Sequence, residues 1–479
     1  MTIKASGTLK FSDIEDEFGQ GQSSFGRCMS NYYEPNEYGD MLLPMDEGIP
    51  TSGGIKFSDF YGKKLNIIVD AYTGNTPVYQ INANSLSKTT VGTRVTKSVG
   101  TINSSKKVII HVNRPIGSVT QEQATGQNQV AFKTGNWNGA NVKLYVGGQG
   151  LIAGGGGKGG NGGINARGYA DNYNGAGNKN MKGGDGTSAL GIEDTSIEVT
   201  VMASNHPLRK SSGTPGAIVA GCAGGGGGAG ADRWQWVTEP RQVWEGEYVQ
   251  ETVPNPDYDP DADPPGPETI TQNSSTKLLV NKTRITLVRY WSGGGGGGGG
   301  AGLPAGTGGD KGSPTGTIPR DAGDWGSRGE LAPASIRAKP GEAGKDGLNI
   351  SNLNSGMDGE GGFFGMGGSG LARGGKGGDG GNYQSGSSSI LGFVGGDSQF
   401  PTYAGEIPYP AGFNAISFDI NPHPSIYKKQ PDSRFQETGG PTGNAGYAVL
   451  CSSSWNNYGS NHDGSRVIGT FSQQQPIQG

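Results

Sequence analysis

Side chains that commonly carry out catalysis or bind metals are few in this chain and widely spaced. Neither its three cysteines nor its four histidines recur at the short spacing of a metal site or of a nucleophile and its base. An odd number of distant cysteines also indicates no disulfide framework. These residues are Cys28, Cys222, Cys451, His111, His206, His423 and His462. We therefore expect no enzyme, no metal centre and no cofactor, and we interpret His111 as an ordinary strand histidine.

Carboxylates alternate with other residues in the segment 257–263, which is the most regular set of ligand-type side chains. Oxygen ligands at every second position are typical of calcium loops. However, the position that an EF-hand reserves for glycine holds Ala262 or Pro264, depending on the register. We favour a solvated acidic loop and leave calcium binding open. The four carboxylates are Asp257, Asp259, Asp261 and Asp263.

Aromatic side chains are the other candidate binding groups. Trp234 and Trp236 alternate, which predicts that they share one face of a strand. We expect Trp244 and Tyr248 to line the same face of a partner strand, with Glu239-Pro240 in the turn. Such a platform suits sugar rings or an apolar surface patch; the alternative is that the rings cover a small sheet with little other core. The candidate binding residues are Tyr169, Tyr173, Trp234, Trp236, Trp244 and Tyr248.

The composition limits the kinds of fold that could position these groups. Glycine makes up 93 of 479 residues, and only 32% of the residues are hydrophobic, against about 45–50% in an average protein. These values exclude one large apolar core. The formal net charge of −4, without a basic stripe, argues against a nucleic-acid partner. The sequence has no run of about 18 apolar residues, so we expect no membrane span.

The glycine-rich region, residues 147–448, has a period of three. Residues 156–164 read Gly-Gly-Lys, Gly-Gly-Asn, Gly-Gly-Ile, and residues 374–382 read Gly-Gly-Lys, Gly-Gly-Asp, Gly-Gly-Asn. An α-helix would need a period of 3.6 and a strand a period of 2, whereas three residues per turn is the polyproline-II period. Pairs such as Gly159-Gly160 and Gly377-Gly378 would then fill two ridges of such a helix, and a polar residue the third.

This arrangement predicts a bundle of polyglycine-II helices, with variable loop inserts between them. The helix makes no internal hydrogen bonds, so buried N–H and C=O groups must pair with neighbouring helices. Collagen is excluded because it needs glycine at every third position with abundant proline. A flexible glycine-rich chain remains an alternative, although such linkers usually mix glycine with serine.

A short motif near the N-terminus occurs twice. Residues 9–14 read LKFSDI and residues 55–60 read IKFSDF. A capping box at Ser12 predicts a short helix with Ile14 and Phe18 on one face. Small repeats of this kind can dock onto a larger assembly; the alternative is that they pack on the domain that follows.

The complete chain is predicted to be mainly β and irregular, with very little α-helix. Residues 1–64 form a docking segment with the two KFSD repeats, and residues 65–146 a β-sandwich or barrel-like domain. Residues 147–448 form the polyglycine-II domain, and residues 449–479 a C-terminal tail.

Several of these segments resemble proteins of tailed bacteriophages. The stretches AIVAGCAGGGGGAG (217–230) and RYWSGGGGGGGGAG (289–302), which alternate with dissimilar inserts, look like the receptor-binding adhesins at the tips of tail fibres. The ending GNAGYAV (443–449) resembles the close of glycine-rich phage tail domains, and the KFSD and SDFYG stretches resemble N-terminal segments of other phage tail proteins.

The resemblance implies a virion structural protein located in the tail, namely a tail-fibre or tail-tip adhesin. Its displayed loops would bind a host surface receptor, either a polysaccharide or an outer-membrane protein, and residues 1–64 would bind other phage tail proteins. This chain departs from the familiar tip adhesin because it carries its own docking segment and β-domain, so a homo-oligomer such as a trimer stays open. The alternative function is an architectural tail or baseplate component that contacts neighbouring subunits without binding a receptor.

Overall fold

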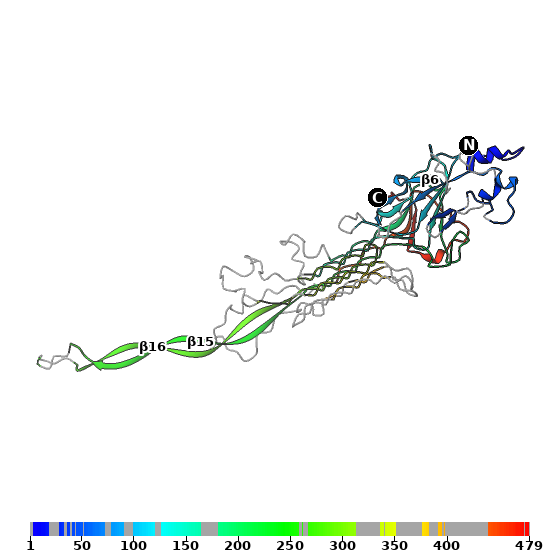
Figure 1. The fold of residues 1–479 in the computed structure, drawn as a ribbon. Coiled ribbons are helices and arrows are strands. Elements are labelled where there is room, and N and C mark those ends of the chain that lie inside the picture. The colour runs from blue at the N-terminus through cyan, green and yellow to red at the C-terminus, as the bar shows by residue number, and fades with distance from the viewer. Residues whose placement is uncertain are drawn as a thin grey trace.

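The protein is long and narrow, with a β-sheet body at one end and a long hairpin at the other (Figure 1). Glycine-rich segments run between the two ends, and both marked chain ends lie at the body. The fold is mainly β, and α1 (Phe11–Phe18) is the only α-helix among the described residues. The computed structural model describes residues 3–18, 28–32, 36–38, 41–43, 45–50, 52–71, 78–90, 99–119, 126–163, 181–257, 261, 267–312, 336–339, 341–350, 376–382, 391–394, 397, 439–473 and 475–478.

The body consists of three five-stranded sheets. The first sheet has the order β13 (Glu198–Val201), β10 (Asn141–Val146), β7 (Lys107–Val112), β3 (Asn66–Asp70) and β6 (Lys88–Thr90). The second has the order β19 (Val467–Ile468), β14 (Ala217–Val219), β11 (Leu151–Ala153), β8 (Pro115–Gly117) and β4 (Val78–Tyr79). The third has the order β20 (Thr470–Gln473), β18 (Tyr447–Cys451), β12 (Ser188–Ile192), β9 (Val130–Lys133) and β5 (Ile81–Asn82).

The chain visits the three sheets in rotation, as in a parallel β-solenoid. One coil runs through β7, β8 and β9, the next through β10, β11 and β12, and a third through β13, β14 and β18. Apart from the antiparallel pair β3 and β6, neighbouring strands of these sheets are parallel. Inward-facing side chains of all three sheets, such as Ile110, Ile152 and Leu190, share one buried core.

This topology differs from the sandwich or barrel expected for residues 65–146. Strands β11 to β14 and β18 to β20 come from beyond residue 146 and complete the same sheets. Parallel pairing allows this because the partners need not be near in sequence. Leu190 of β12, for example, is paired with Val449 of β18.

The N-terminal segment packs on the outer face of the first sheet. It contains α1, the 3-10 turns η1 (Met29–Tyr32) and η2 (Phe57–Phe60), and the hairpin strands β1 (Asn36–Tyr38) and β2 (Met41–Leu43). Ile14 and Phe18 are buried on one face of α1, as predicted, in a cluster with outward-facing Ile68, Ile109 and Tyr145 of the sheet. The described part of residues 1–64 therefore packs on the following domain. Docking onto other proteins stays a prediction.

The two KFSD repeats share a capping hydrogen bond, although the first begins the α-helix α1 and the second forms the 3-10 turn η2. This cap differs from the predicted one. The backbone N–H of Lys10 donates to Asp13 Oδ2 at 3.0 Å, and that of Lys56 donates to Asp59 Oδ2 at 2.7 Å. The aspartate of each motif thus closes its own turn, and Ser12 is not the cap because the helix begins before it. The first aromatic rings of the two repeats also meet edge to face, with centroids 5.7 Å apart.

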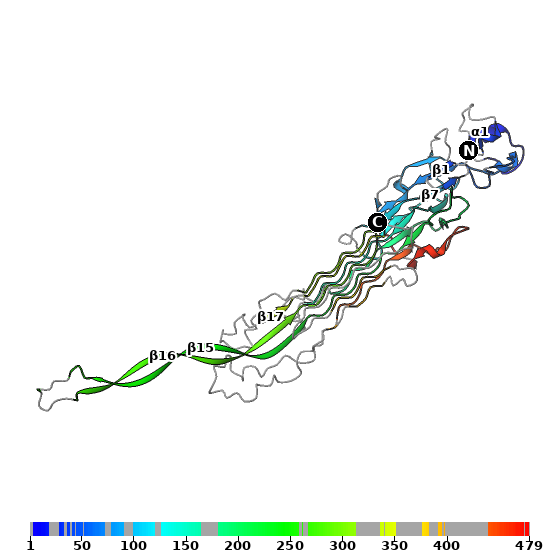
Figure 2. The ribbon, with the colours of Figure 1, turned by 60° about the horizontal axis from the view of Figure 1, so that its bottom comes forward.

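The glycine segments leave the body where the second and third sheets meet. One insert, residues 154–187, joins β11 to β12, and another, residues 220–446, joins β14 to β18. Because β11 lies beside β14 and β12 beside β18, the inserts leave and return side by side (Figure 2). Seven of their described stretches, here called the glycine segments, are residues 154–163, 181–187, 220–230, 293–312, 341–350, 376–382 and 439–446.

Backbone hydrogen bonds join the glycine segments to one another, and segment 154–163 is bonded to several neighbours. The Gly159 N–H donates to Thr307 O and the Gly160 N–H to Gly225 O, both at 2.8 Å, and Gly160 O accepts from the Gly297 N–H at 2.8 Å. The pattern repeats every third residue. The donor–acceptor pairs from segment 154–163 are Gly156–Pro304, Gly159–Thr307, Gly162–Asp310, Gly157–Cys222, Gly160–Gly225 and Gly163–Gly228. Bonds between extended segments thus replace a side-chain core in this region.

The non-glycine residues of the triplets lie on the outside, as the period predicts. Lys158 and Lys376 are exposed and Asn161 and Asp379 are half-buried, whereas the glycines between them are buried. Ile164, the third member of the first ridge, lies outside the described residues.

Polar side chains on these outer ridges bind the backbone of adjacent segments. Asn161 Oδ1 accepts from the Asp310 N–H at 2.9 Å, and Asp185 Oδ1 accepts from the Asn444 N–H at 2.8 Å. Asp346 Oδ1 accepts in the same way from a backbone N–H at 2.8 Å. These side-chain oxygens accept hydrogen bonds from amides on the outside of the glycine segments.

The glycines singled out as scaffold positions have no room for a side chain. Gly159, Gly160, Gly377 and Gly378 are all buried. A Cβ added to them would lie well inside contact distance of the carbonyl oxygens of Gly297, Met181, Gly296 and Phe393, respectively.

Replacing Gly160 by Val is therefore expected to destabilise the protein by about 3 kcal/mol or more, or to prevent folding, because backbone cannot move aside. Replacing the exposed Lys158 by Ala is expected to change stability by less than about 0.5 kcal/mol. Thermal unfolding and protease resistance of the two variants test this, and equal tolerance of both changes would contradict close backbone packing.

Candidate functional site

The most prominent candidate for contact with another molecule is the hairpin of β15 (Ala231–Pro254) and β16 (Thr269–Ser292). Its 24-residue strands pair in continuous antiparallel register, from Ala231 opposite Ser292 to Pro254 opposite Thr269. At roughly 3.3 Å per residue the ribbon is about 80 Å long. Its outer part stands clear of the other described elements in both views (Figures 1 and 2).

The outer end of the hairpin is exposed and acidic. The Asn255 N–H donates to Glu268 O at 2.9 Å and closes the ladder. The described residues 250–257 and 267–272 are exposed or half-buried. The segment 250–272 has six carboxylates and no lysine, arginine or histidine. Of the alternating aspartates, Asp257 and Asp261 are described and exposed, and the other two lie outside the described residues.

The hairpin register corrects the prediction for the tryptophans. Trp234, Trp236, Trp244 and Tyr248 all lie in β15, so Trp244 and Tyr248 are not on a partner strand. The predicted turn at Glu239-Pro240 is wrong, because these residues lie in mid-strand opposite Arg284 and Thr283. An edge strand tolerates proline because one side of it need not donate hydrogen bonds. The predicted candidates Tyr169 and Tyr173 lie outside the described residues.

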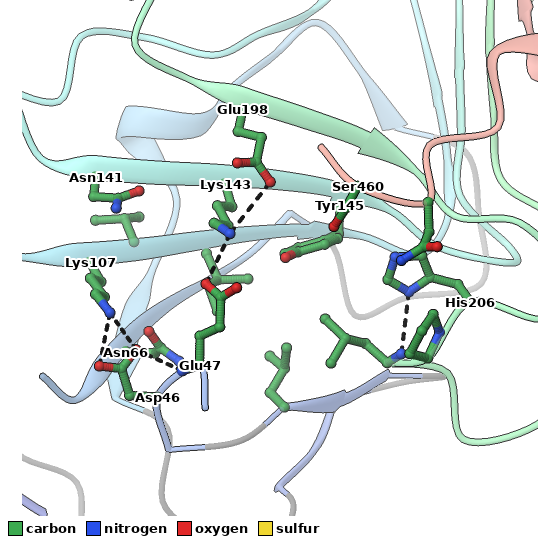
Figure 3. A pocket seen from close by; sticks show the side chains of 16 residues that line it. Asp46, Glu47, Asn66, Lys107, Asn141, Lys143, Tyr145, Glu198, His206 and Ser460 are labelled. Carbon is green, nitrogen blue, oxygen red and sulfur yellow. Dashed lines mark hydrogen bonds and ion pairs between the residues drawn. The ribbon is translucent and has the colours of Figure 1, made fainter. Parts of the chain in front are cut away.

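A second candidate is a pocket of about 200 Å³ in the body, between the N-terminal segment and the first sheet (Figure 3). Lys107 of β7 and Lys143 of β10 point into it from the sheet, and Asp46 and Glu47 face them from the N-terminal segment. Tyr145, Glu198, His206 and Ser460 complete much of its wall.

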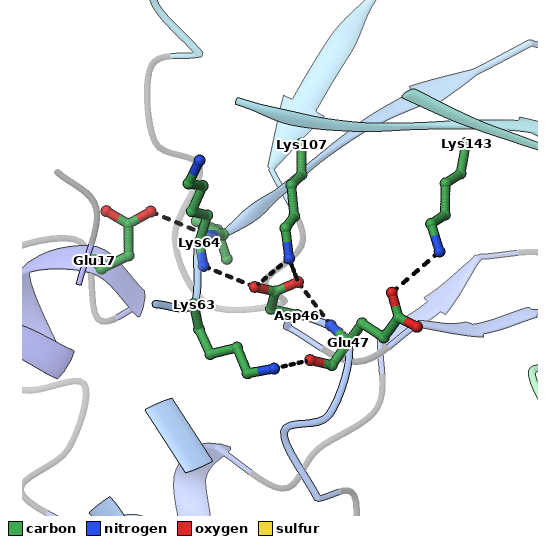
Figure 4. A network of polar contacts seen from close by, with 8 residues as sticks. Glu17, Asp46, Glu47, Lys63, Lys64, Lys107 and Lys143 are labelled. Atoms are coloured by element: carbon green, nitrogen blue, oxygen red, sulfur yellow. Dashed lines mark hydrogen bonds and ion pairs between the residues drawn. The ribbon is translucent and has the colours of Figure 1, made fainter. Parts of the chain in front are cut away.

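The charged groups of this pocket are paired with one another (Figure 4). Lys107 Nζ lies 2.6 Å from Asp46 Oδ1 and 2.9 Å from Asp46 Oδ2, and the Lys64 N–H donates to Asp46 Oδ2 at 2.8 Å. Lys143 Nζ lies 3.1 Å from Glu47 Oε2 and 3.4 Å from Glu198 Oε1. The arrangement can hold the N-terminal segment on the sheet, and it leaves neither lysine free to bind an anion.

The residues of these two ion pairs, here called the clamp, were not predicted from the sequence. Asp46 and Lys107 are 61 positions apart, and Glu47 and Lys143 are 96 apart. No local spacing could have joined them, because the contact depends on how the N-terminal segment lies across the strands.

Two further reactive side chains of the described residues, His111 and Cys451, are buried in strands. His111 is buried in β7, at 2% exposure. Burial raises the pKa of the Cys451 thiol to about 11, which disfavours the thiolate. The described residues contain no group of three or more His, Cys, Asp or Glu side chains that could hold a metal ion. Among them, no helix has the length and apolar character needed to cross a bilayer.

Comparison with known proteins finds no family model, no curated protein and no solved structure that matches this chain.

Replacing Lys107 by Met is expected to destabilise the attachment of the N-terminal segment by about 3 kcal/mol or more, because it leaves the fully buried Asp46 carboxylate without its cation. Glu47→Gln is the matched control; its side chain is 78% exposed, and we expect a loss below about 1 kcal/mol. Limited proteolysis and denaturant unfolding measure both. Equal losses would contradict the assigned role of the Asp46–Lys107 pair.

Acidification is expected to loosen the same attachment. The hydrogen bond from Lys143 lowers the pKa of Glu47, so its contribution is present above the unfolded pKa and is lost as the pH falls through the folded value. Burial lowers the pKa of His206, so protonation near its ordinary pKa of about 6.5 also favours the unfolded state. Proteolytic release of residues 1–64 should therefore accelerate between about pH 7 and pH 4. A constant rate over this range would refute the assignment.

Proposed function

We propose that the glycine segments are polyglycine-II helices packed as a bundle. The support is the step of three residues in their backbone hydrogen bonds and in the exposure of Lys158, Asn161, Lys376 and Asp379. A three-residue period is the period of this helix. The bundle would act as a rigid spacer whose stiffness comes from paired backbone instead of an apolar core.

We further propose that the chain is a virion structural protein of a tailed phage, a tail-fibre or tail-tip adhesin that binds the host surface. The observation that carries this proposal is the separation of the two ends of the molecule (Figure 1). The body and both marked chain ends lie at one end, and the exposed hairpin extends from the other. A spacer with a projecting contact element is the layout that attachment to a distant surface requires.

In this proposal the outer hairpin, residues 249–274, meets a polysaccharide or an outer-membrane protein of the host. The N-terminal segment and the body would join the protein to other tail proteins. Several copies on one particle would convert weak individual contacts into firm attachment. No catalytic step is part of the proposed function.

The second candidate is an architectural tail or baseplate component. It is favoured by apolar side chains exposed on the flank of the bundle, where a neighbouring subunit could cover them. Leu391, Phe393 and Val394 are 54–65% exposed, and Leu348 is 54% exposed.

The two functions are separated by shortening the hairpin. Residues 249–274 are replaced by Asn-Gly, which closes the ladder after Tyr248 opposite Ser275 in a two-residue turn. The control variant keeps the full length and carries Leu348→Ser on the bundle flank. We expect host-cell binding of the purified protein to fall at least about tenfold in the shortened variant and to be unchanged in the control. Full binding by the shortened variant would refute a receptor contact at the outer hairpin, and no binding by the intact protein would favour the architectural function.

A further inference from the structure

We propose that the pocket between the N-terminal segment and the first sheet binds one uncharged, hydroxyl-rich ring, such as a single unit of a carbohydrate. The observation that carries this inference is the Tyr145 hydroxyl. Tyr145 is only 8% exposed, and its hydroxyl points into the pocket, toward Lys143 and Glu47 (Figure 3). Within the described part of the chain this hydroxyl has no hydrogen-bond partner. A buried tyrosine hydroxyl normally has one, so this group is available to a ligand.

The groups nearest the Tyr145 hydroxyl combine donors and acceptors. Lys143 Nζ lies 3.1 Å from Glu47 Oε2 and 3.4 Å from Glu198 Oε1. An ammonium has three N–H donors, so these two contacts leave one for a ligand. Each carboxylate has a second oxygen that can accept a hydrogen bond. A ligand hydroxyl both donates and accepts, so a ligand with several hydroxyls matches this mixed set.

The charges of the lining favour an uncharged ligand. Two lysine ammoniums and three carboxylates line the pocket, so an anion would face a net negative wall. A cation would have to displace Lys143 from its two carboxylates. Burial raises the pKa of Tyr145 to about 12 and lowers that of His206, so both side chains are neutral at pH 7. An uncharged ligand keeps the ion pairs intact and buries no new charge.

The size of the pocket matches a single ring. A cavity of about 150 Å³ accepts benzene, so about 200 Å³ accommodates one hydroxylated ring. Val108 and Leu208 add apolar lining, which suits the C–H groups of such a ring. The exposed Asn141, Ser460 and Asn461 also line the pocket. The pocket therefore opens to solvent there, and the neighbouring units of a longer carbohydrate chain would remain outside.

A ligand in this pocket would bridge two parts of the protein. Glu47 belongs to the N-terminal segment, whereas Tyr145 lies in β10 and Glu198 in β13. Binding to the joined state alone stabilises that state, so the ligand should strengthen the attachment of the N-terminal segment. The inference does not depend on the proposed adhesin function, because a free sugar and a unit of a polysaccharide offer the same hydroxyls.

The test is binding of neutral sugars to the full-length protein, measured by calorimetry and ligand-observed NMR. The probes are glucose, galactose, mannose and N-acetylglucosamine, with sodium sulfate as an anionic comparison. The test variant is Tyr145→Phe, which removes the hydroxyl and keeps the ring. The matched control is Tyr79→Phe, the same change at a residue of β4 that is 48% exposed and outside the pocket. We expect at least one sugar to bind about tenfold more weakly to the test variant, and less than about twofold more weakly to the control.

A second measurement reads the attachment of the N-terminal segment. The bound sugar should slow proteolytic release of residues 1–64 in the intact protein, and at the same concentration it should have a smaller effect on the Tyr145→Phe variant. Release of both proteins at equal rates without sugar would show that the variant is folded.

The source of the ligand is identified by adding polysaccharides, namely dextran and mannan. Binding of the free sugar alone would support a small-molecule ligand, and polysaccharide binding that the free sugar competes away would support a glycan chain. No binding of any probe would overturn the inference. Equal weakening by the two tyrosine variants, or sulfate binding as tight as that of the sugars, would do the same.

Discussion

The structure depends on one constraint: the buried backbone N–H and C=O groups of the glycine segments must form hydrogen bonds with one another. Ordering glycine costs more conformational entropy than ordering any other residue, and each net hydrogen bond returns only about 0.5–1.5 kcal/mol. The bundle can be stable only if nearly every buried amide is paired. The regular bonds from segment 154–163 to residues 222–228, 297 and 304–310 meet this condition. The same condition explains why a Cβ at Gly160 has no place, and why side-chain oxygens of Asn161 and Asp185 bind amides at the bundle surface.

The solenoid body holds the ends of the glycine segments in fixed positions, which isolated segments would lack. Segment 154–163 continues β11 and segment 220–230 continues β14, and these strands are already paired in register. Segments 181–187 and 439–446 return to β12 and β18, which are also neighbours. The body has a conventional apolar core, so the entropy of aligning the glycine segments is offset in part by folding of the sheets from which they extend.

Local periodicity predicted part of this fold, and long-range pairing decided the rest. The triplet pattern predicted the buried glycines and the outward Lys158 and Asp379, because a period of three can be recognised within about ten residues of sequence. Helix α1 and its buried face were predicted for the same reason. The parallel solenoid was missed because its partners are separated by inserts of up to 227 residues, 220–446. Pro240 suggested a turn where the chain continues as an edge strand. The ion pair of Asp46 and Lys107 could not be predicted, because the two residues are far apart in the sequence.

Hydrogen exchange resolved to single amides tests the central claim most directly. If backbone pairing holds the bundle together, the amides of Gly156, Gly157, Gly159 and Gly160 should exchange far more slowly than the amide of exposed Lys158, so that protection follows a period of three. Uniformly fast exchange along residues 154–163, or protection alternating with a period of two, would contradict the account.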